Sequence, residues 1–306
     1  PSANLLAYFP MDGNTLDTSS AAGGSASANH ATWTGTAGFQ SGIFGQSALV
    51  GDGLGSNYLT TTSSEYVFGS NSFTILYWVN VKAAVSSDPV LVAGGGKNWS
   101  SSGGTLGWVS AVKGDDVKAN VSDGSSRTDT AWIDLDHDVY YNDNRIHWAL
   151  VALVVDRTAN TLTSYVLDEN VVTIGDDASS PATTAISGGN LTGTNQNIVI
   201  GQDGDFAGYG TSPYPGLPAT GIDDLSIWGR VLTQAEIQTI YTEGRAGKPL
   251  SALLGTNFLT TSLDKDAGTA TLAWLDYDLD GLSSPELRVS RNGALIATLA
   301  ATATGY

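Results

Sequence analysis

Short apolar runs, separated by stretches rich in glycine, serine, asparagine and aspartate, dominate the hydrophobic pattern of this chain. In the run 73–81 apolar side chains fall on both alternating faces, which predicts a central β-strand buried on two sides. The run 146–155 is the most hydrophobic and is expected to lie in the core. Further runs of this kind predict strands at 5–10, 48–50, 58–60, 89–93, 106–112, 162–168, 198–201 and 222–228. The pattern is typical of an all-β protein with long loops.

One short C-terminal helix interrupts the strand pattern, at residues 233–241. Thr233 and Glu236 have the spacing of a capping box, and Gly244 is expected to stop the helix. We therefore place the end of the first domain at residue 247, and residues 248–255 are interpreted as a linker.

From residue 256 onward the pattern predicts a second, smaller unit. Strand signals cover 269–274 and 287–297, and the pair Asn292-Gly293 predicts a hairpin turn. Residues 256–306 resemble the first half of a fibronectin type III sandwich, which implies a partial second β-sandwich. A partial module suggests a piece of a larger multidomain protein.

Composition narrows the classes of partner. The chain has 13 Lys and Arg residues against 30 Asp and Glu, for a net charge of −17. Such a surface repels nucleic acid and anionic membranes, and no apolar run is long enough for membrane insertion. With no cysteine, disulfides and zinc–thiolate sites are excluded. Aspartates in glycine-rich loops suit calcium, although an acidic solubility coat is the alternative explanation.

Four motifs in order resemble the laminin-G-like group of the concanavalin A-like lectin and glucanase fold. They are residues 7–14, 72–79, 146–151 and 221–233. The resemblance implies two antiparallel sheets packed face to face as a jelly-roll sandwich, spanning residues 1–247. Ligands in this fold usually meet the concave sheet or the loops at one rim. Because the fold hosts lectins, adhesion domains and enzymes, it does not fix the function.

The resemblance also implies a calcium ion that ties the N-terminal loop to the last strand. Its ligands would come from Asp12, Asn14, Asp223 and Asp224, together with backbone carbonyls. Calcium takes six to eight oxygen ligands, so two distant segments must combine to supply them. The alternative is that 12–14 form a simple turn and that Asp223 or Asp224 caps local backbone.

A second calcium site is suggested by residues 201–205, which resemble a pentraxin loop. Asp203 and Asp205 occupy its ligand positions. The partner loop of pentraxins carries an Asp-Asn pair, whereas this chain has Lys97-Asn98, and Lys97 would oppose a nearby cation. A glycine- and aspartate-rich hairpin turn is the alternative.

Aromatic side chains near these loops are candidate sugar contacts, because aromatic faces stack on the C–H patches of sugars. If the loops 94–105 and 203–218 converge, they form a rim. The predicted ligand-binding residues are Asn98, Trp99, Trp108, Tyr209 and Tyr214. The alternative places Trp108 in the core and makes Trp99 the cover of a loop.

Two further acidic motifs carry weaker signals. Asp134, Asp136 and Asp138 resemble the alternating carboxylates of glucanases, but those enzymes use two glutamates, so we do not expect an enzyme. Residues 276–281 match the first half of an EF-hand loop, but Leu287 stands where its bidentate glutamate belongs.

Together these patterns predict an extracellular, calcium-dependent carbohydrate-binding or adhesion module of a larger secreted or cell-surface protein, of bacterial origin. Its partners would be a glycan or polysaccharide and the other domains of the parent protein. A structural spacer attached to a secreted hydrolase or adhesin is the first alternative. A glycan-cleaving enzyme of the same fold is the second.

Overall fold

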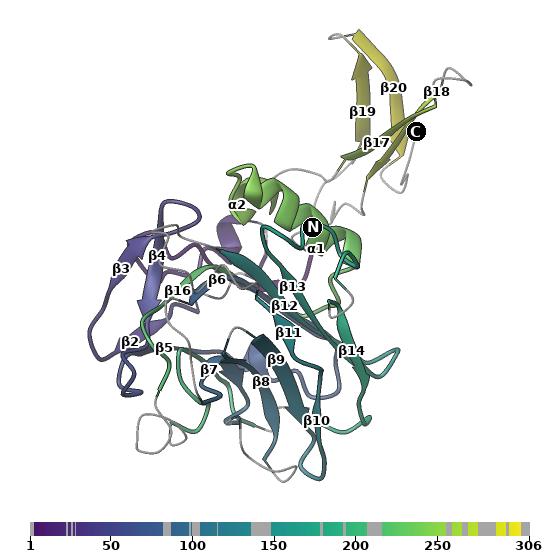
Figure 1. Cartoon of the computed structure of the whole chain (residues 1–306). Coiled ribbons are helices and arrows are strands. Elements are labelled where there is room, and N and C mark those ends of the chain that lie inside the picture. The colour runs from purple at the N-terminus through teal and green to yellow at the C-terminus, as the bar shows by residue number, and fades with distance from the viewer. Residues whose placement is uncertain are drawn as a thin grey trace.

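The computed structural model describes most of the chain from residue 3 to residue 300. The residues outside this description are 1–2, 23, 26, 28, 82–86, 98, 100–104, 115, 136–147, 178–179, 192–193, 207–215, 255–258, 265–268, 275–285, 292–293 and 301–306. Side chains are also not described at 21–22 and after residue 254. The main body consists of two eight-stranded antiparallel sheets, with helices against one of them (Figure 1).

The first sheet, sheet A, runs in the order β14-β13-β12-β6-β16-β4-β3, and β1 also pairs with β16. The central strand β6 lies between β12 and β16, which confirms the prediction from its two apolar faces. The strands are β1 (Leu5–Phe9), β3 (Phe39–Ser41), β4 (Gln46–Val50), β6 (Phe73–Val81), β12 (Ala149–Asp156), β13 (Thr161–Leu167), β14 (Ala182–Ala185) and β16 (Thr220–Trp228).

The second sheet, sheet B, runs in the order β10-β9-β8-β7-β15-β5-β2, and β11 also pairs with β9. Its strands are β2 (Thr32–Thr34), β5 (Tyr58–Thr62), β7 (Val90–Gly94), β8 (Gly107–Lys113), β9 (Asp116–Ser122), β10 (Arg127–Asp129), β11 (Ile133–Asp134) and β15 (Asn197–Ile200). Two short 3-10 helices, η1 (Ser19–Ala22) and η2 (Ser64–Tyr66), lie in the loops.

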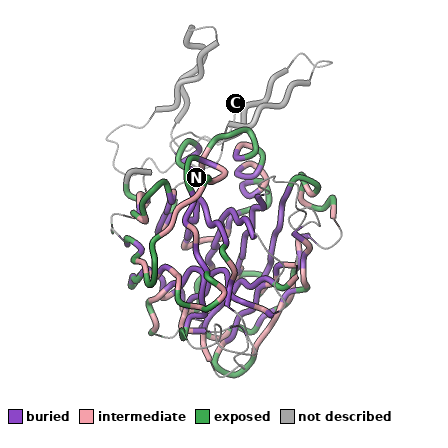
Figure 2. Tube along the Cα trace, turned by 60° about the vertical axis from the view of Figure 1, so that its left-hand side comes forward, coloured by how far each residue is buried: buried purple, intermediate pink, exposed green. Residues whose placement is uncertain are grey.

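The main core fills the space between the two sheets, and strand alternation sorts the side chains into it. Phe73, Ile75 and Tyr77 of β6 point between the sheets, whereas Leu76 and Trp78 point to the outer face of sheet A. Buried residues accordingly follow the strands of the sandwich, and exposed ones gather in loops (Figure 2). Burying such large apolar side chains contributes about 1.5–3 kcal/mol each.

Helices α1 (Gln234–Arg245) and α2 (Leu250–Leu254) cover the outer face of sheet A. Their apolar residues form a second core with that face, together with Leu232 before α1; the helical members are Ile237, Ile240, Tyr241, Leu250, Leu253 and Leu254. The stretch 248–255, which was predicted to be a linker, contains α2. The buried leucines of α2 extend the packing of the sandwich through Leu254.

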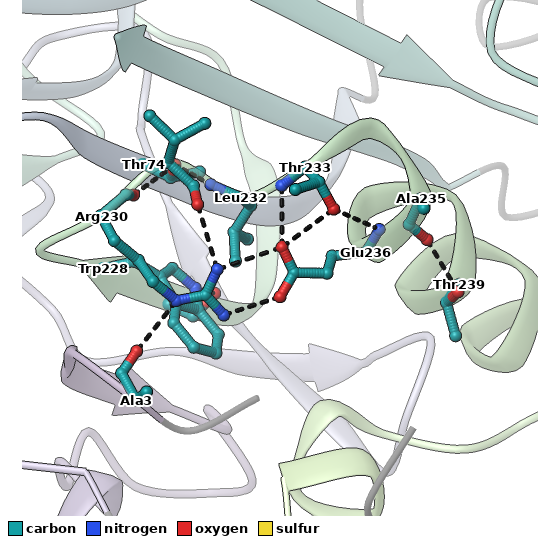
Figure 3. A network of polar contacts seen from close by, with 11 residues as sticks. Ala3, Thr74, Trp228, Arg230, Leu232, Thr233, Ala235, Glu236 and Thr239 are labelled. Carbon is teal, nitrogen blue, oxygen red and sulfur yellow. Dashed lines mark hydrogen bonds and ion pairs between the residues drawn. The ribbon is translucent and has the colours of Figure 1, made fainter. Parts of the chain in front are cut away.

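The predicted capping box of α1 is present. Thr233 Oγ1 accepts a hydrogen bond from the backbone N–H of Glu236, and Thr233 N donates to Glu236 Oε2 at 2.8 Å. Arg230 extends this network, because its guanidinium donates to both carboxylate oxygens of Glu236, at 2.8 and 3.0 Å, and lies over the Trp228 ring (Figure 3). Thr74 of β6 bonds to backbone of the 230–232 turn, so the start of the helix is fixed to the sheet.

Gly244 does not stop α1, contrary to the prediction. The helix continues to Arg245, and a Cβ at Gly244 would lie 2.5 Å from a ring carbon of Trp78. The glycine therefore serves close packing of the helix on the sheet. Gly247, with φ of +83°, follows the end of the helix.

After residue 258 the backbone forms two separate two-stranded antiparallel sheets. One pairs β17 (Leu259–Asp264) with β18 (Thr269–Trp274), and the other pairs β19 (Glu286–Arg291) with β20 (Ala294–Ala300). The second pair confirms the hairpin predicted across Asn292-Gly293. In the described part of the chain, no helix has the length and apolar character needed to cross a membrane.

Candidate functional site

Two tryptophans cover part of the outer face of sheet B, the face turned away from the main core. Trp99 is 6% exposed and packs on outward-facing residues of β7 and β8, and Trp132 packs beside it and stays partly exposed. The two ring centroids are 5.5 Å apart, with the rings tilted by 44°. This face therefore presents an aromatic surface whose accessible part is Trp132.

Two cations stand over these rings. Val117 and Ala119 of β9 point into the main core, so Lys118 between them points to the outer face of sheet B. Lys118 Nζ lies 5.1 Å from the Trp132 ring centroid and 5.8 Å from that of Trp99. Arg127 Cζ lies 4.8 Å from the Trp99 centroid. These distances allow cation–π attraction. We call Trp99, Lys118, Arg127 and Trp132 the tryptophan surface.

The two cations differ in their partners. Arg127 forms an ion pair with Asp129 at 2.6 Å and donates to the backbone carbonyl of Trp99 at 2.5 Å, so it holds Trp99 in place and its charge is compensated. Among the residues that the structure describes, Lys118 has neither a hydrogen bond nor a carboxylate partner, and only the two indole rings contact its ammonium. Within the described part of the chain, the charge of Lys118 on the tryptophan surface is therefore not paired with a carboxylate, although the protein is strongly acidic.

The loops after β7 and β15 meet beside this surface, which is the condition that the sequence analysis set for a rim. Trp99 N donates to Asp203 Oδ1 at 2.9 Å, and Gly204 N donates to the carbonyl of Lys97 at 3.0 Å. The backbones approach so closely that a Cβ at Gly204 would lie 2.8 Å from that carbonyl oxygen. These contacts fix the position of Trp99 over sheet B.

Lys97 is fully buried within this loop cluster. Burial lowers the pKa of Lys97 to about 8, with a further contribution from Arg127, while Asp129, Asp203 and Asp205 act in the opposite direction. Burial raises the pKa of Asp203 to about 7, Asp205 raises it further, and the bond from Trp99 and the charge of Lys97 oppose this. The ammonium group of Lys97 thus lies near the carboxylates of Asp203 and Asp205. That ammonium opposes a divalent cation, so the donor set does not fit calcium at Asp203 and Asp205.

The other predicted sugar contacts have mixed outcomes. Trp108 has no exposed surface and lies in the main core against Phe73, with ring centroids 5.9 Å apart. Its prediction as a ligand-binding residue is wrong for that reason, and the core alternative describes it. Asn98, Tyr209 and Tyr214 lie outside the described residues.

The second predicted site lies where β1, β16 and α2 meet. Asp224 has a left-handed φ of +47° within an irregularity of β16, and Tyr8 donates to its Oδ1 at 2.5 Å. Leu250 N at the start of α2 donates to its Oδ2 at 2.7 Å. Asp224 is therefore buried and links β1 to the start of α2, which differs from the local backbone cap given as the alternative.

Asp223 and Asp12 hold the loop between β3 and β4. Phe44 N donates to Asp223 Oδ2 at 3.1 Å, and Gln46 N donates to Asp12 Oδ1 at 2.8 Å. Asn14 Oδ1 accepts from Leu16 N at 3.0 Å within its own turn. Asp12 and Asp223 thus lie on either side of one short loop, whereas Asn14 serves local backbone.

These acidic groups perturb each other. Burial raises the pKa of Asp223 to about 8, and repulsion by Asp224 and Asp12 adds to the effect. Burial likewise raises the pKa of Asp224 to about 7, with a contribution from Asp12 and opposing hydrogen bonds from Tyr8 and Leu250. In the absence of a cation, the folded protein therefore favours protonated carboxyl groups here.

Within the described ranges, no group of three or more His, Asp or Glu side chains is arranged to hold a metal ion. We call Asp12, Asp223 and Asp224 the N-terminal cluster. A calcium site there would therefore use at most a pair of these carboxylates, such as Asp12 and Asp223, with carbonyl oxygens. A cation bound here would relieve the repulsion by Asp12 and Asp224 that raises the pKa of Asp223. Calcium binding stays a prediction.

The two acidic motifs with weaker signals, residues 134–138 and 276–281, lie mostly outside the described residues. Asp134 belongs to β11, but Asp136 and Asp138 fall in the segment 136–147, and residues 276–281 fall in 275–285, all outside the described residues. The interpretations of both motifs therefore stay predictions.

Sequence reasoning missed Lys118, Arg127 and Trp132. The alternation of β9 already places Lys118 on the face opposite Val117 and Ala119, and lysines are scarce in this chain, so Lys118 carried a usable signal. Trp132 carried none, because its place beside Trp99 depends on the irregular path from β10 to β11.

A two-sheet antiparallel sandwich with an aromatic outer face defines a protein of the lectin-like β-sandwich class. A family model described as the concanavalin A-like lectin/glucanases superfamily (Laminin_G_3) matches residues 52–238. This chain belongs to that superfamily, since the match covers more than half of its length. The match starts later and ends earlier than the predicted domain 1–247.

Solved structures with a similar fold are binding domains of bacterial toxins. The binding domain of Paraclostridial Mosquitocidal Protein 1 has a TM-score of 0.56 and 13% identity, covering 96% of this chain and 67% of that one. The botulinum neurotoxin serotype C1 binding domain has a TM-score of 0.52 and 13% identity, covering 79% and 52%. The binding domain of Botulinum Neurotoxin DC in complex with SialylT has a TM-score of 0.53 and 11% identity, covering 97% and 69%.

At these identities the similarity shows the fold alone, and this chain spans roughly half to two thirds of the length of those structures. No curated protein matches the chain in sequence. None of these comparisons supports a fibronectin type III module in residues 256–306, so that prediction gains no support.

Proposed function

We propose that this chain is a non-catalytic carbohydrate-binding module of a larger secreted or cell-surface bacterial protein. The tryptophan surface is the observation that carries the proposal. A partly exposed indole, held beside a second indole and a cation, offers the combination of flat apolar face and polar group by which proteins hold sugars.

Two further observations support the proposal. The superfamily includes lectins, and structures of similar fold are toxin binding domains, one of them in complex with SialylT and another described by its interaction with two ganglioside molecules. The acidic, cysteine-free composition also suits a secreted module with no nucleic-acid partner.

Calcium is proposed as a stabilising ion at Asp12 and Asp223, whose carboxylates both bond to backbone N–H groups of residues 44–46. We do not propose it at Asp203 and Asp205, because Lys97 is buried among those groups. The ion would stabilise the module without contacting the glycan, since the tryptophan surface belongs to sheet B and the N-terminal cluster to sheet A.

The test is a binding screen of the full chain on a broad glycan and polysaccharide panel, with calcium and with EDTA. We expect binding in both buffers and its loss in Trp132→Ala. Val172→Ala is the matched control, because Val172 is 49% exposed beside α1, away from sheet B. Absence of binding in both buffers would overturn the proposal and favour a structural spacer.

A further inference from the structure

Lys118 distinguishes the tryptophan surface from a neutral sugar platform. Most described cations of this chain already have an acidic or carbonyl partner; examples are Lys113 with Asp88, Arg230 with Glu236 and Lys248 with Glu243. Lys118 has neither within the described residues, although the chain carries 30 acidic residues. An ammonium that no described carboxylate pairs with, next to accessible aromatic surface, is suited to bind an anion.

We infer that the tryptophan surface binds an acidic sugar, with Lys118 contacting its carboxylate or sulfate group and Trp132 stacking on its ring. This inference rests on the proposed carbohydrate-binding function and names the class of ligand and the contacting residues.

The geometry supports this division of roles. Lys118 Nζ lies 5.1 Å from the Trp132 centroid, close enough for one ring-sized ligand to touch both groups. Arg127 is committed to Asp129 and to the Trp99 carbonyl, so it positions Trp99 and does not need to contact the ligand. The charges of Arg127 and Asp129 compensate each other, which leaves Lys118 as the cation available to an acidic sugar.

The net negative charge of the protein determines how its affinity for an acidic polysaccharide should depend on salt. A surface with a net charge of −17 repels an anionic polysaccharide at long range, so binding depends on short-range contacts at the site. Moderate salt should screen the repulsion more than the partly covered contact at Lys118. Affinity for the acidic glycan should therefore not collapse at physiological salt, in contrast to binding by a diffuse basic patch.

The experiment measures affinity of the full chain for uronic-acid, sialic-acid and sulfated oligosaccharides, each next to its uncharged counterpart. We expect an acidic ligand to bind about 10- to 100-fold more tightly than its counterpart, which is the range for one charged hydrogen bond. Lys118→Met should remove that preference and keep the residual affinity for the neutral form. Lys113→Met is the matched control, because it removes a charge from the same sheet at a lysine already paired with Asp88.

The outcomes separate the two proposals. Equal binding of charged and neutral ligands, or an unchanged preference in Lys118→Met, overturns this inference while the carbohydrate-binding function stands. Binding of no ligand at all overturns both. If Lys118→Met melts well below the wild type, Lys118→Gln, which keeps a polar group of similar length, gives the same comparison in a folded protein.

Discussion

Replacing Asp223 with asparagine should flatten the pH dependence of the stability of this protein in EDTA. Asp223 is buried and its pKa is raised from 3.8 to about 8. Between those values the folded protein keeps a proton that the unfolded chain has released. Stability from this group is therefore complete below pH 3.8 and is lost as the pH rises toward 8.

The size of the effect follows from the same values. One proton difference changes the free energy of unfolding by about 1.4 kcal/mol per pH unit, so the wild type should lose about 3 kcal/mol between pH 5 and pH 7 from Asp223. For a domain of this size, that corresponds to a fall of about 6–12 °C in Tm. The amide of Asp223→Asn does not titrate, so this part of the fall should disappear.

The measurement is the Tm of the wild type and of Asp223→Asn in EDTA, taken from thermal melts between pH 5 and pH 7. Asp176→Asn, at an exposed loop position, is the control for loss of one acidic group. Equal pH slopes in the wild type and Asp223→Asn would refute the reasoning, because Asp223 would then hold no extra proton in the folded state.

Adding calcium tests the metal proposal in the same assay. A bound cation requires ionised ligands, so calcium should raise the Tm of the wild type more at pH 8 than at pH 5. At a hundredfold excess over its Kd, it would add about 2.7 kcal/mol. Both Asp12→Asn and Asp223→Asn should abolish the increase. A wild-type Tm that calcium leaves unchanged at pH 8 would remove the calcium proposal.

Three further changes probe the packing. Tyr8→Phe removes a hydroxyl that serves a buried carboxylate, so the urea midpoint should fall by the equivalent of about 1–3 kcal/mol; an unchanged midpoint would contradict that role. Gly94→Ala would place a Cβ 2.6 Å from Trp108 Nε1 and should cost about 1–3 kcal/mol in thermal melts, whereas Gly188→Ala, with nothing within 4 Å, should melt like the wild type. Thr233→Ala removes the N-cap of α1 and should cost about 1 kcal/mol, seen as faster amide exchange in the first turn.

The architecture could be predicted where periodicity and capping chemistry act locally. The two apolar faces of 73–81 identified the central strand, and Thr233 with Glu236 identified the start of α1. The three-residue strands β2 and β3 were missed, because runs as short as Thr-Trp-Thr carry no period and gain their order from pairing with β5 and β4. α2 was missed because five residues after Lys-Pro have no helical period, and its leucines are fixed by the second core.

The candidate site was predicted in part. The meeting of Trp99 with Asp203 followed from two loops that flank paired strands, β7 and β15. The burial of Lys97 could not be read from composition, because it depends on how closely glycine-rich loops pack. For Trp108 the core alternative was available from the sequence, because it lies within a predicted strand. The pairing of Trp132 with Lys118 depends on the pairing of β9 with β11, which no local pattern encodes.

The two helices make the two outer faces of the sandwich different. They occupy the outer face of sheet A, whereas the tryptophan surface belongs to the outer face of sheet B. A module that rests on a polysaccharide layer by sheet B would therefore have α2 on its far side. Leu254, the last residue of α2, would then lie on the side turned away from that layer, separated from it by the thickness of the sandwich.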